Sequence, residues 1–417
     1  MHSALLIMAA LSGVGLIYFI LVRRTFDFVS AGFIGQLIYF SPGFYGYLGN
    51  PYYPGVLPSV PIANATYGVW NLCLAATILT GLIYRPERES GAPLVTPLAF
   101  DLALVAAIIF SGILSFSTGT GVLSTDKHEV LDNVNRFFLL FASCSQVGVV
   151  AFAIQRKWHF LGIAGVAMLF LLYAGFRGEF AISIIAIATY IAHRHRVFIF
   201  LKLRYLIPAL LSFALLLAYK PFLTAYRIGN WQVLNQLQMS DNLVDTLTLQ
   251  FEPFLTQAVL NEVLVRNFEV ATSSLYFALV ALVPFLAPTL GLRPEDVAFN
   301  FQDYLFPNLP YGVTASPQTQ MIASAGYVGL FFYIFVFNVL LVLCSRKLNA
   351  RSPYWRLFFL TVGAFLAFYI QRNDLANSFT IINRIGLAIL VCWIGNWFII
   401  AGSTRGEGDG RSKVAAG

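Results

Sequence analysis

One stretch decides the fold class: residues 327–345, YVGLFFYIFVFNVLLVLCS, carry no charge. A helix of this length is about 28 Å long, close to the ~30 Å hydrocarbon thickness of a bilayer. Backbone N–H and C=O groups inside lipid must be bonded within the segment, so a run of this kind has to be helical. The stretch therefore predicts a transmembrane helix.

Apolar runs of this kind recur along the chain. Of its 417 residues, 58% are hydrophobic and 11% are charged, whereas soluble domains have about 25% charged residues. The runs lack the alternation of an outer-membrane β-barrel. We expect an all-α polytopic integral membrane protein with about eleven transmembrane helices. The expected spans are 4–22, 28–48, 66–84, 97–116, 135–154, 159–176, 179–193, 204–219, 321–344, 355–371 and 380–400.

The two ends of the chain need separate treatment. The span 4–22 is as apolar as a signal peptide, but its basic pair, Arg23 and Arg24, follows it and no small-residue cleavage site is clear. We therefore keep it as a span of the mature protein. The domain organisation that we expect is one membrane domain over 1–417, with a long external loop at 220–320 and a disordered tail at 402–417.

Basic residues collect in alternate connections between the spans, and the formal net charge is +7. Such connections face the cytoplasm in most membrane proteins, which places the N-terminus outside and the C-terminus inside. No basic face interleaved with aromatic residues occurs, so we expect no nucleic-acid partner. The basic connections are Arg23/Arg24, Arg85/Arg88, Arg156/Lys157, 193–204, 346–356 and 405–413.

The four cysteines lie inside apolar runs without CxxC spacing, as small buried residues do. No histidine and carboxylate triad, Ser-His-Asp arrangement or Walker loop can be assembled. We therefore expect no metal and no cofactor, and we exclude a soluble-type hydrolase and an ATPase.

The external connection 220–320 is much longer than connections usually are, which indicates a functional loop. Ser240 or Asp241 is placed to start a helix with an apolar face that reaches Leu255, and Pro253 should kink or break it. The apolar run 275–290 is interrupted by prolines. A full crossing there would break the alternation of basic connections, so a re-entrant or interfacial helix is favoured over a span.

Several cations lie on the external side, against the charge rule. They suit an anion-binding cavity, because guanidinium groups bind phosphate bidentately and intramembrane charges are costly. The alternative is snorkelling or ion pairing, such as Arg177 with Glu179 or Arg372 with Asp374. The candidates are Arg177 in the tight turn 175–179, Lys220 and Arg227 where the long loop begins, Arg372 in the turn 371–374, and Arg384 about one turn inside the last span.

Two external carboxylates are candidates for a catalytic base. Glu179 and Glu252 have apolar sequence neighbours, which would make the carboxylate a stronger base. The other external carboxylates are expected to be solvated.

The order of motifs resembles the O-antigen polymerase (Wzy-type) family of oligosaccharide repeat-unit polymerases. The resemblance covers roughly 160–390 and includes four motifs. They are Gly-x-Arg-Gly at 175–178, the proline-rich 283–288, Tyr311-Gly312-Val313-Thr314-Ala315-Ser316-Pro317 before the Ala-Gly-Tyr-Val-Gly-Leu entry at 325–330, and Gln371-Arg372-Asn373-Asp374-Leu375. The chain departs from the family at Gln318 or Gln320, where an acidic residue is frequent.

The resemblance implies an inner-membrane glycosyltransferase that works at the periplasmic face of a bacterium. It would polymerise undecaprenyl-diphosphate-linked repeat units, with membrane lipid and a chain-length regulator as further partners. The N-terminus would be periplasmic. The arginines would neutralise the diphosphate, a carboxylate would deprotonate the acceptor hydroxyl, and Tyr311 would pack against a sugar.

Two rivals remain. An O-antigen ligase is similar in layout but generally carries a histidine in the long loop, and this loop has none. A lipid-linked oligosaccharide flippase or another transporter would show paired halves and short external loops, and neither is evident here.

Overall fold

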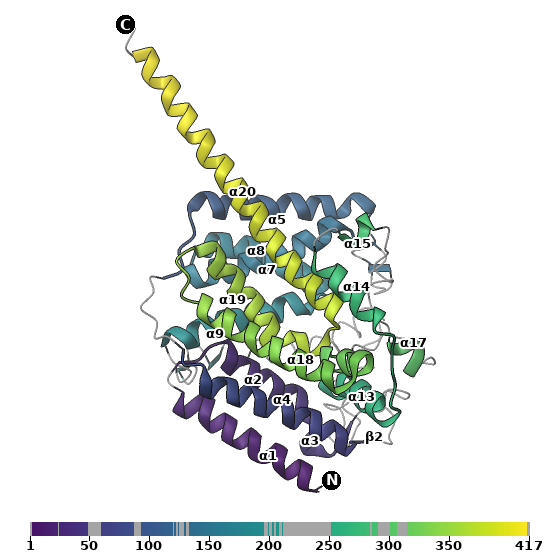
Figure 1. Ribbon diagram of the computed structural model, residues 1–417. Helices are drawn as coiled ribbons and strands as arrows, with labels where there is room; N and C mark the ends of the chain where they lie inside the picture. The colour runs from purple at the N-terminus through teal and green to yellow at the C-terminus, as the bar shows by residue number, and fades with distance from the viewer. Residues whose placement is uncertain are drawn as a thin grey trace, which may run out of the picture. The chain divides into compact units, whose positions relative to one another are not determined.

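The protein is described here from a computed structural model (Figure 1), in which two compact units are distinguished. The first unit comprises 1–89, 188–346 and 362–383, and the second comprises 90–187, 347–361 and 384–417. The residues that the structure describes are 2–23, 25–48, 60–86, 93–119, 121, 124, 129–130, 133–195, 199, 202–203, 206–207, 211, 252–283, 286–290, 301–306 and 315–414.

Within the described residues, six helical segments are long and apolar enough to cross a membrane. They agree with an all-α membrane protein, while the number of spans stays a prediction. The six are α1 (His2–Leu16) continued by η1 (Ile17–Val22), α4 (Asn64–Ile83), α5 (Leu98–Ser115), α7 (Arg136–Gln155), α18 (Pro317–Lys347) and α20 (Leu375–Val414). Other helices include α8 (Trp158–Tyr173), α9 (Arg177–His195) and α19 (Pro353–Ala367).

In the first unit, α4 packs between α1 and α2 (Phe28–Phe40), as Figure 1 shows. The predicted span 28–48 does not form one continuous helix. Helix α2 ends at Phe40 and is followed by α3 (Pro42–Tyr45) and a two-residue strand, β1 (Tyr47–Leu48). This strand pairs antiparallel with β2 (Val60–Pro61). At about 20 Å, α2 is too short to cross the hydrocarbon layer alone.

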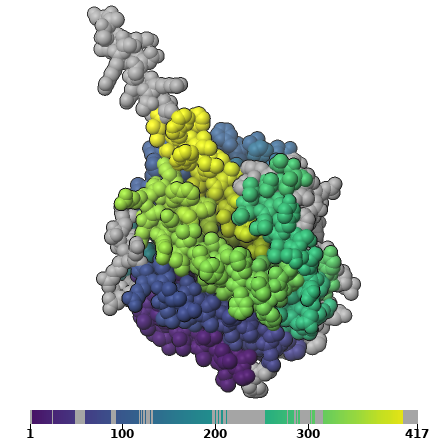
Figure 2. All heavy atoms as spheres, viewed as in Figure 1, coloured from purple at the N-terminus to yellow at the C-terminus, as the bar shows by residue number. Residues whose placement is uncertain are grey.

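The outer faces of the long helices are apolar. On α1 and its continuation η1, Leu6, Val14 and Leu21 are 68%, 59% and 62% exposed, and Figure 2 shows this helix at the surface in purple. Exposed apolar side chains of this size would be costly in water over a large area, but hydrocarbon solvates them. The surface therefore fits a lipid environment.

In the second unit, α5, α7 and α8 pack against one another. The α7–α8 turn places Lys157 against the buried Asp101 carboxylate, which also accepts a hydrogen bond from Thr96 Oγ1 at 2.6 Å. Gln155 Oε1 accepts from the Thr96 backbone N–H at 2.9 Å. These polar contacts fix the turn to the start of α5.

The loop 220–320 contains a helix that the sequence did not predict, α13 (Glu252–Val265). Pro253 lies in its first turn, where the missing N–H costs nothing, so the proline begins this helix. The predicted helix from Ser240 or Asp241 lies outside the described residues. Asn261 Oδ1 accepts hydrogen bonds from the Ala63 backbone N–H and the Thr66 hydroxyl, both at 2.9 Å. Thus α13 belongs to the packed interior of the first unit.

The apolar run 275–290 forms two short helices, α14 (Ser273–Leu282) and α15 (Leu286–Thr289). At about 15 Å, α14 covers half of the hydrocarbon thickness. The short helix α17 (Phe301–Leu305) follows. This geometry favours the re-entrant or interfacial arrangement over a single crossing helix.

The last helix, α20, continues to Val414, into the tail 402–417 that the sequence predicts to be disordered. No proline occurs between Leu375 and Val414, so no residue lacks the backbone N–H that the helix needs.

Removing the Asn261 amide should destabilise the first unit. Asn261→Ala leaves the Ala63 N–H and the Thr66 hydroxyl buried without their acceptor, which should cost about 1–3 kcal/mol. A thiol-reactive dye followed during heating in detergent measures this, because all four cysteines are buried.

The matched control lies on the same helix. Arg266→Ala removes a partly exposed ion pair with Glu262 and should change the stability by less than about 1 kcal/mol. Equal midpoints for the two variants would contradict the buried role of Asn261.

Candidate functional site

The structure places the predicted site residues as follows. Arg177 and Glu179 lie in the first turn of α9, Arg372 ends η5 (Tyr369–Arg372), and Arg384 lies in α20. Glu252 is the first residue of α13. Lys220, Arg227 and Tyr311 lie outside the described residues, so their predicted roles stay predictions.

A tight turn presents Arg177, as the sequence predicts. Helix α8 ends with the Gly175 N–H donating to Leu172 O at 3.0 Å and the Phe176 N–H donating to Leu171 O at 2.9 Å. Gly175 has φ +97°, a left-handed conformation that glycine adopts without strain. Helix α9 then begins at Arg177, so the Gly-x-Arg-Gly motif is a helix-to-helix turn whose arginine sits on a helix N-terminus.

Two of the predicted residues meet within the second unit. The Glu179 carboxylate lies near enough to the Arg384 guanidinium for the two charges to attract each other. Arg384 is half-buried, and its Nε has no hydrogen-bond partner among the described residues. This attraction has no local signal in the sequence, where Arg177 is the candidate partner of Glu179.

In the first unit, three buried glutamines surround the turn that carries Arg372. Gln318 Nε2 donates to Gln371 Oε1 at 2.7 Å, and Gln320 Oε1 accepts from the Leu375 N–H at 2.8 Å. One polar atom of each amide is buried without a hydrogen-bond partner among the described residues: Gln318 Oε1, Gln320 Nε2 and Gln371 Nε2. Orphan amide atoms of this kind are rare in packed interiors and mark places where a polar ligand or water can bind.

These glutamines were not predicted as site residues. In the sequence, Gln318 and Gln320 stand out only as departures from an acidic position. The signal that would have found them is the presence of two amides within the first turns of an apolar segment, because polar side chains inside a membrane protein are costly and therefore informative.

The Arg372 side chain is held by its neighbour Tyr369. Its guanidinium carbon lies 4.9 Å from the centre of the Tyr369 ring, and Nη1 donates to the Tyr369 hydroxyl at 2.7 Å. Asp374, the alternative partner that the sequence offers for Arg372, caps α20. Its Oδ1 accepts from the Asn377 N–H at 2.7 Å, and burial raises the pKa of the Asp374 carboxyl above its ordinary value.

Helix α18 is broken close to the glutamines. Ala325 (φ −145°, ψ 16°) and Gly326 (φ 60°, ψ −154°) are non-helical. They separate a short buried segment, 317–324, from the long segment 327–347. The freed Ala323 carbonyl accepts from the Val270 N–H at 2.8 Å. The break is therefore hydrogen-bonded by the connection that precedes α14, as backbone inside a membrane protein requires.

The end of α14 is tied to α20 in the same unit. Asn383 Nδ2 donates to Ala281 O at 2.7 Å and to Leu282 O at 3.0 Å. A side-chain amide thus satisfies the last carbonyls of the short helix. The broken α18, the short α14 and the start of α20 form one polar assembly within the first unit.

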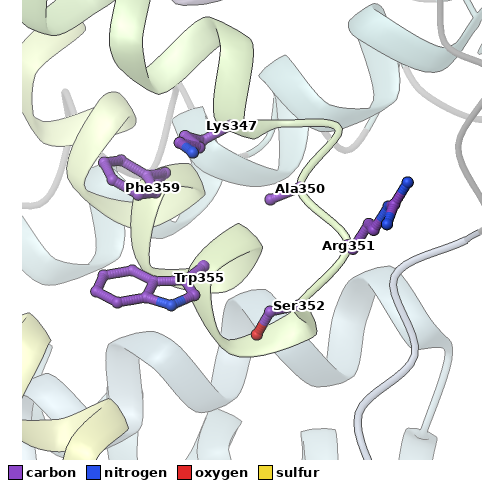
Figure 3. A pocket seen from close by; sticks show the side chains of 6 residues that line it. All are labelled: Lys347, Ala350, Arg351, Ser352, Trp355 and Phe359. Atoms are coloured by element: carbon purple, nitrogen blue, oxygen red, sulfur yellow. The ribbon is translucent and has the colours of Figure 1, made fainter.

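No group of three or more metal-ligating side chains occurs in the part of the chain that the structure describes. A cavity of about 390 Å³ lies in the second unit, at the connection of α18 to α19, and is lined by Lys347, Ala350, Arg351, Ser352, Trp355 and Phe359 (Figure 3). In that view Trp355 and Phe359 form one wall and Arg351 points away from them. The cavity belongs to a basic connection, on the predicted cytoplasmic side, away from the predicted catalytic face.

Replacing Gly326 should damage the site. A φ of 60° with a ψ of −154° is a conformation for glycine almost alone, so Gly326→Ala should cost about 1–3 kcal/mol. The thiol-dye melting midpoint should fall. The control is Gly68→Ala in α4, where a Cβ would enter open space, and its melting midpoint should not fall. A similar fall in the melting midpoint of both variants would argue against a strained break.

Two substitutions of Asp374 should separate the stabilising effect of its helix-capping hydrogen bond from the destabilising effect of its buried charge. Asp374→Ala removes the cap and should cost about 1 kcal/mol, whereas Asp374→Asn keeps an acceptor for the Asn377 N–H. The raised pKa means that the fold favours the neutral carboxyl. The free energy of unfolding of the wild type should therefore decline as the pH rises above the ordinary pKa of an aspartate, whereas that of Asp374→Asn should not show this decline.

The readout is the difference in melting midpoint between Asp374→Asn and the wild type at pH 4.5 and at pH 7. The melting midpoint of Asp374→Asn, relative to that of the wild type, should be higher at pH 7 than at pH 4.5. A difference that is the same at both pH values would contradict a buried, destabilised carboxylate.

No protein-family model, curated protein or solved structure matches this chain.

Proposed function

We propose that this protein is a membrane glycosyltransferase that polymerises undecaprenyl-diphosphate-linked oligosaccharide repeat units at the periplasmic face of a bacterial inner membrane. The proposal rests on the resemblance to O-antigen polymerases and on the polytopic helical architecture. The feature that carries it is the setting of the two motif arginines.

Both arginines sit in short turns between helices, on the side that the charge pattern predicts to be external. Arg177 follows the turn at Gly175, and Arg372 is the last residue of η5, just before α20. Both side chains are half-buried, a position from which a guanidinium can meet an anion at the membrane surface without full hydration. A lipid diphosphate is such an anion.

The proposed reaction joins the acceptor hydroxyl to the anomeric carbon of the growing chain. A new C–O bond forms, the C–O bond to the diphosphate breaks, and undecaprenyl diphosphate leaves with the bonding electrons. The hydroxyl proton goes to a carboxylate base. Arginines stabilise the negative charge that develops on the leaving group.

Glu179 and Glu252 remain the candidate bases. The charge of Glu179 is attracted by the Arg384 guanidinium, which favours the ionised carboxylate that a general base requires. The candidate ligands Lys220, Arg227 and Tyr311 belong to the same proposal, as does an interaction with a chain-length regulator.

Arginine variants test the proposal in a host that lacks the chromosomal gene. Without the gene, lipopolysaccharide should carry single repeat units. Arg372→Ala should reduce chain growth about 100-fold or more, the usual loss when one transition-state donor is removed. Arg372→Lys should keep part of the activity. Gel ladders of the polysaccharide, with immunoblots for protein level, give the measurement.

The matched control is Arg266→Ala, which removes a predicted external arginine that pairs with Glu262. It should leave the ladder unchanged. Full-length polymer in both Arg177→Ala and Arg372→Ala would contradict the proposed role of these arginines in binding the diphosphate, and full-length polymer without the gene would contradict the polymerase itself.

A flippase or transporter is the second candidate, because the break at Ala325 and Gly326 is of the kind that forms substrate sites in transporters. The same deletion strain distinguishes the two. Loss of a polymerase leaves single repeat units on the cell surface, whereas loss of a flippase leaves none. Loss of a ligase would leave long chains on the lipid carrier.

A further inference from the structure

A groove runs along the outer surface of the first unit between α4 and α18. Its volume is about 590 Å³, within the ~300–1,000 Å³ range of small-molecule sites. Leu79 and Ile83 of α4 form one wall, and Phe331 and Phe335 of α18 form the other. All four are more than half exposed, and Figure 2 shows the two helices side by side, α4 in dark blue and α18 in light green.

The groove is long and follows the helix axes. It reaches from Phe331 to Arg346 along α18, which corresponds to about 22 Å of helix. That length exceeds half of the ~30 Å hydrocarbon thickness, and it suits one extended hydrocarbon chain lying in one leaflet. Because both walls belong to apolar helices exposed at the surface, the groove opens to lipid from the side.

The end of the groove at the last turn of α18 is basic. The Arg346 guanidinium carbon lies 5.6 Å from the centre of the Tyr84 ring, and that of Arg23 lies 5.6 Å from the same ring. Arg23 is buried and bonded to the Asp27 carboxylate at 2.8 Å. Arg346 is exposed, and among the described residues none forms an ion pair or hydrogen bond with it.

Arg346 is therefore a cation held by an aromatic ring at the polar end of an apolar groove. A phosphate placed against it would satisfy the guanidinium, and the hydrocarbon chain attached to that phosphate would continue along Leu79 and Phe335. Arg346 also lies in one of the basic connections that predict the cytoplasmic side, where anionic lipids are attracted to basic residues.

We propose that this groove binds an anionic phospholipid of the cytoplasmic leaflet, with its phosphate on Arg346 and one acyl chain between α4 and α18. The site is separate from the proposed glycosyltransferase site and does not rest on that function. A transmembrane helix of another protein is the competing occupant. It would use Asn338, whose buried Oδ1 lines the groove without a hydrogen-bond partner among the described residues.

Native mass spectrometry of the full chain in detergent tests the proposal. The probes are dioleoyl phosphatidylglycerol and dioleoyl phosphatidylcholine, which share acyl chains and differ in net charge. The wild type should retain phosphatidylglycerol about fivefold better than phosphatidylcholine, the preference expected from one basic residue near the surface. Arg346→Ala should lose this preference, and Arg346→Lys should keep it.

A second variant tests the chain-binding part. Val339→Trp fills the groove from its exposed α18 wall and should lower the binding of both lipids. Since Val339 is nearly half exposed, the substitution leaves the packed interior intact. Unaltered binding by Val339→Trp would overturn the groove as the seat of the acyl chain.

The charge control is Arg194→Ala, an exposed arginine of α9 that also contacts a tyrosine, Tyr190, at 3.4 Å. It should keep the lipid preference. An equal loss in Arg194→Ala and Arg346→Ala would overturn a specific site in favour of bulk charge. An Asn338→Leu protein that loses phosphatidylglycerol while Arg346→Ala retains it would also overturn the lipid assignment.

Discussion

The rest of the first unit depends on how the break in α18 is hydrogen-bonded. A helix that stops inside an apolar segment exposes carbonyls that lipid cannot satisfy, at a cost of several kcal/mol for each. Here the connection before α14 supplies the donors: Val270 N–H to Ala323 O at 2.8 Å, and Thr272 Oγ1 to Ser324 O at 3.2 Å. The break therefore fixes the position of the α13–α14 connection, and through Asn383 at the other end of α14 that connection is tied to α20.

Long uninterrupted helices could be predicted from the sequence. The spans 66–84, 97–116 and 135–154 correspond within about two residues to α4, α5 and α7, because continuous apolar composition without an internal proline leaves helix as the only outcome. Composition carries no such information about Ala325 and Gly326, which are as apolar as their neighbours. Their non-helical backbone arises from tertiary contacts with residues about fifty positions earlier in the chain, and hydropathy does not report those contacts.

In the candidate site too, some features follow from the local sequence and others depend on contacts between distant residues. The turn that presents Arg177 follows from local chemistry, because a glycine with a positive φ ends α8. The contact of Gln318 with Gln371 joins residues 53 positions apart, and the approach of Glu179 to Arg384 joins two different helices. Neither has a local signal. Arg23 is a further example: the sequence places it in a basic connection, whereas burial against Asp27 makes it a structural ion pair, and burial raises the pKa of that carboxyl while Arg23 opposes the rise.

The glutamines also constrain the proposed chemistry. An amide neither takes up nor releases a proton near neutral pH, so Gln318 and Gln320 cannot act as the general base that an acidic residue at this place would supply. Neutral amides cost less to bury than carboxylates, and each can donate and accept, which suits orientation of a polar substrate. A polymerase built on this chain therefore has to take its base from a carboxylate elsewhere. Of the two candidates, Glu179 is the one for which the structure gives a charged neighbour, Arg384.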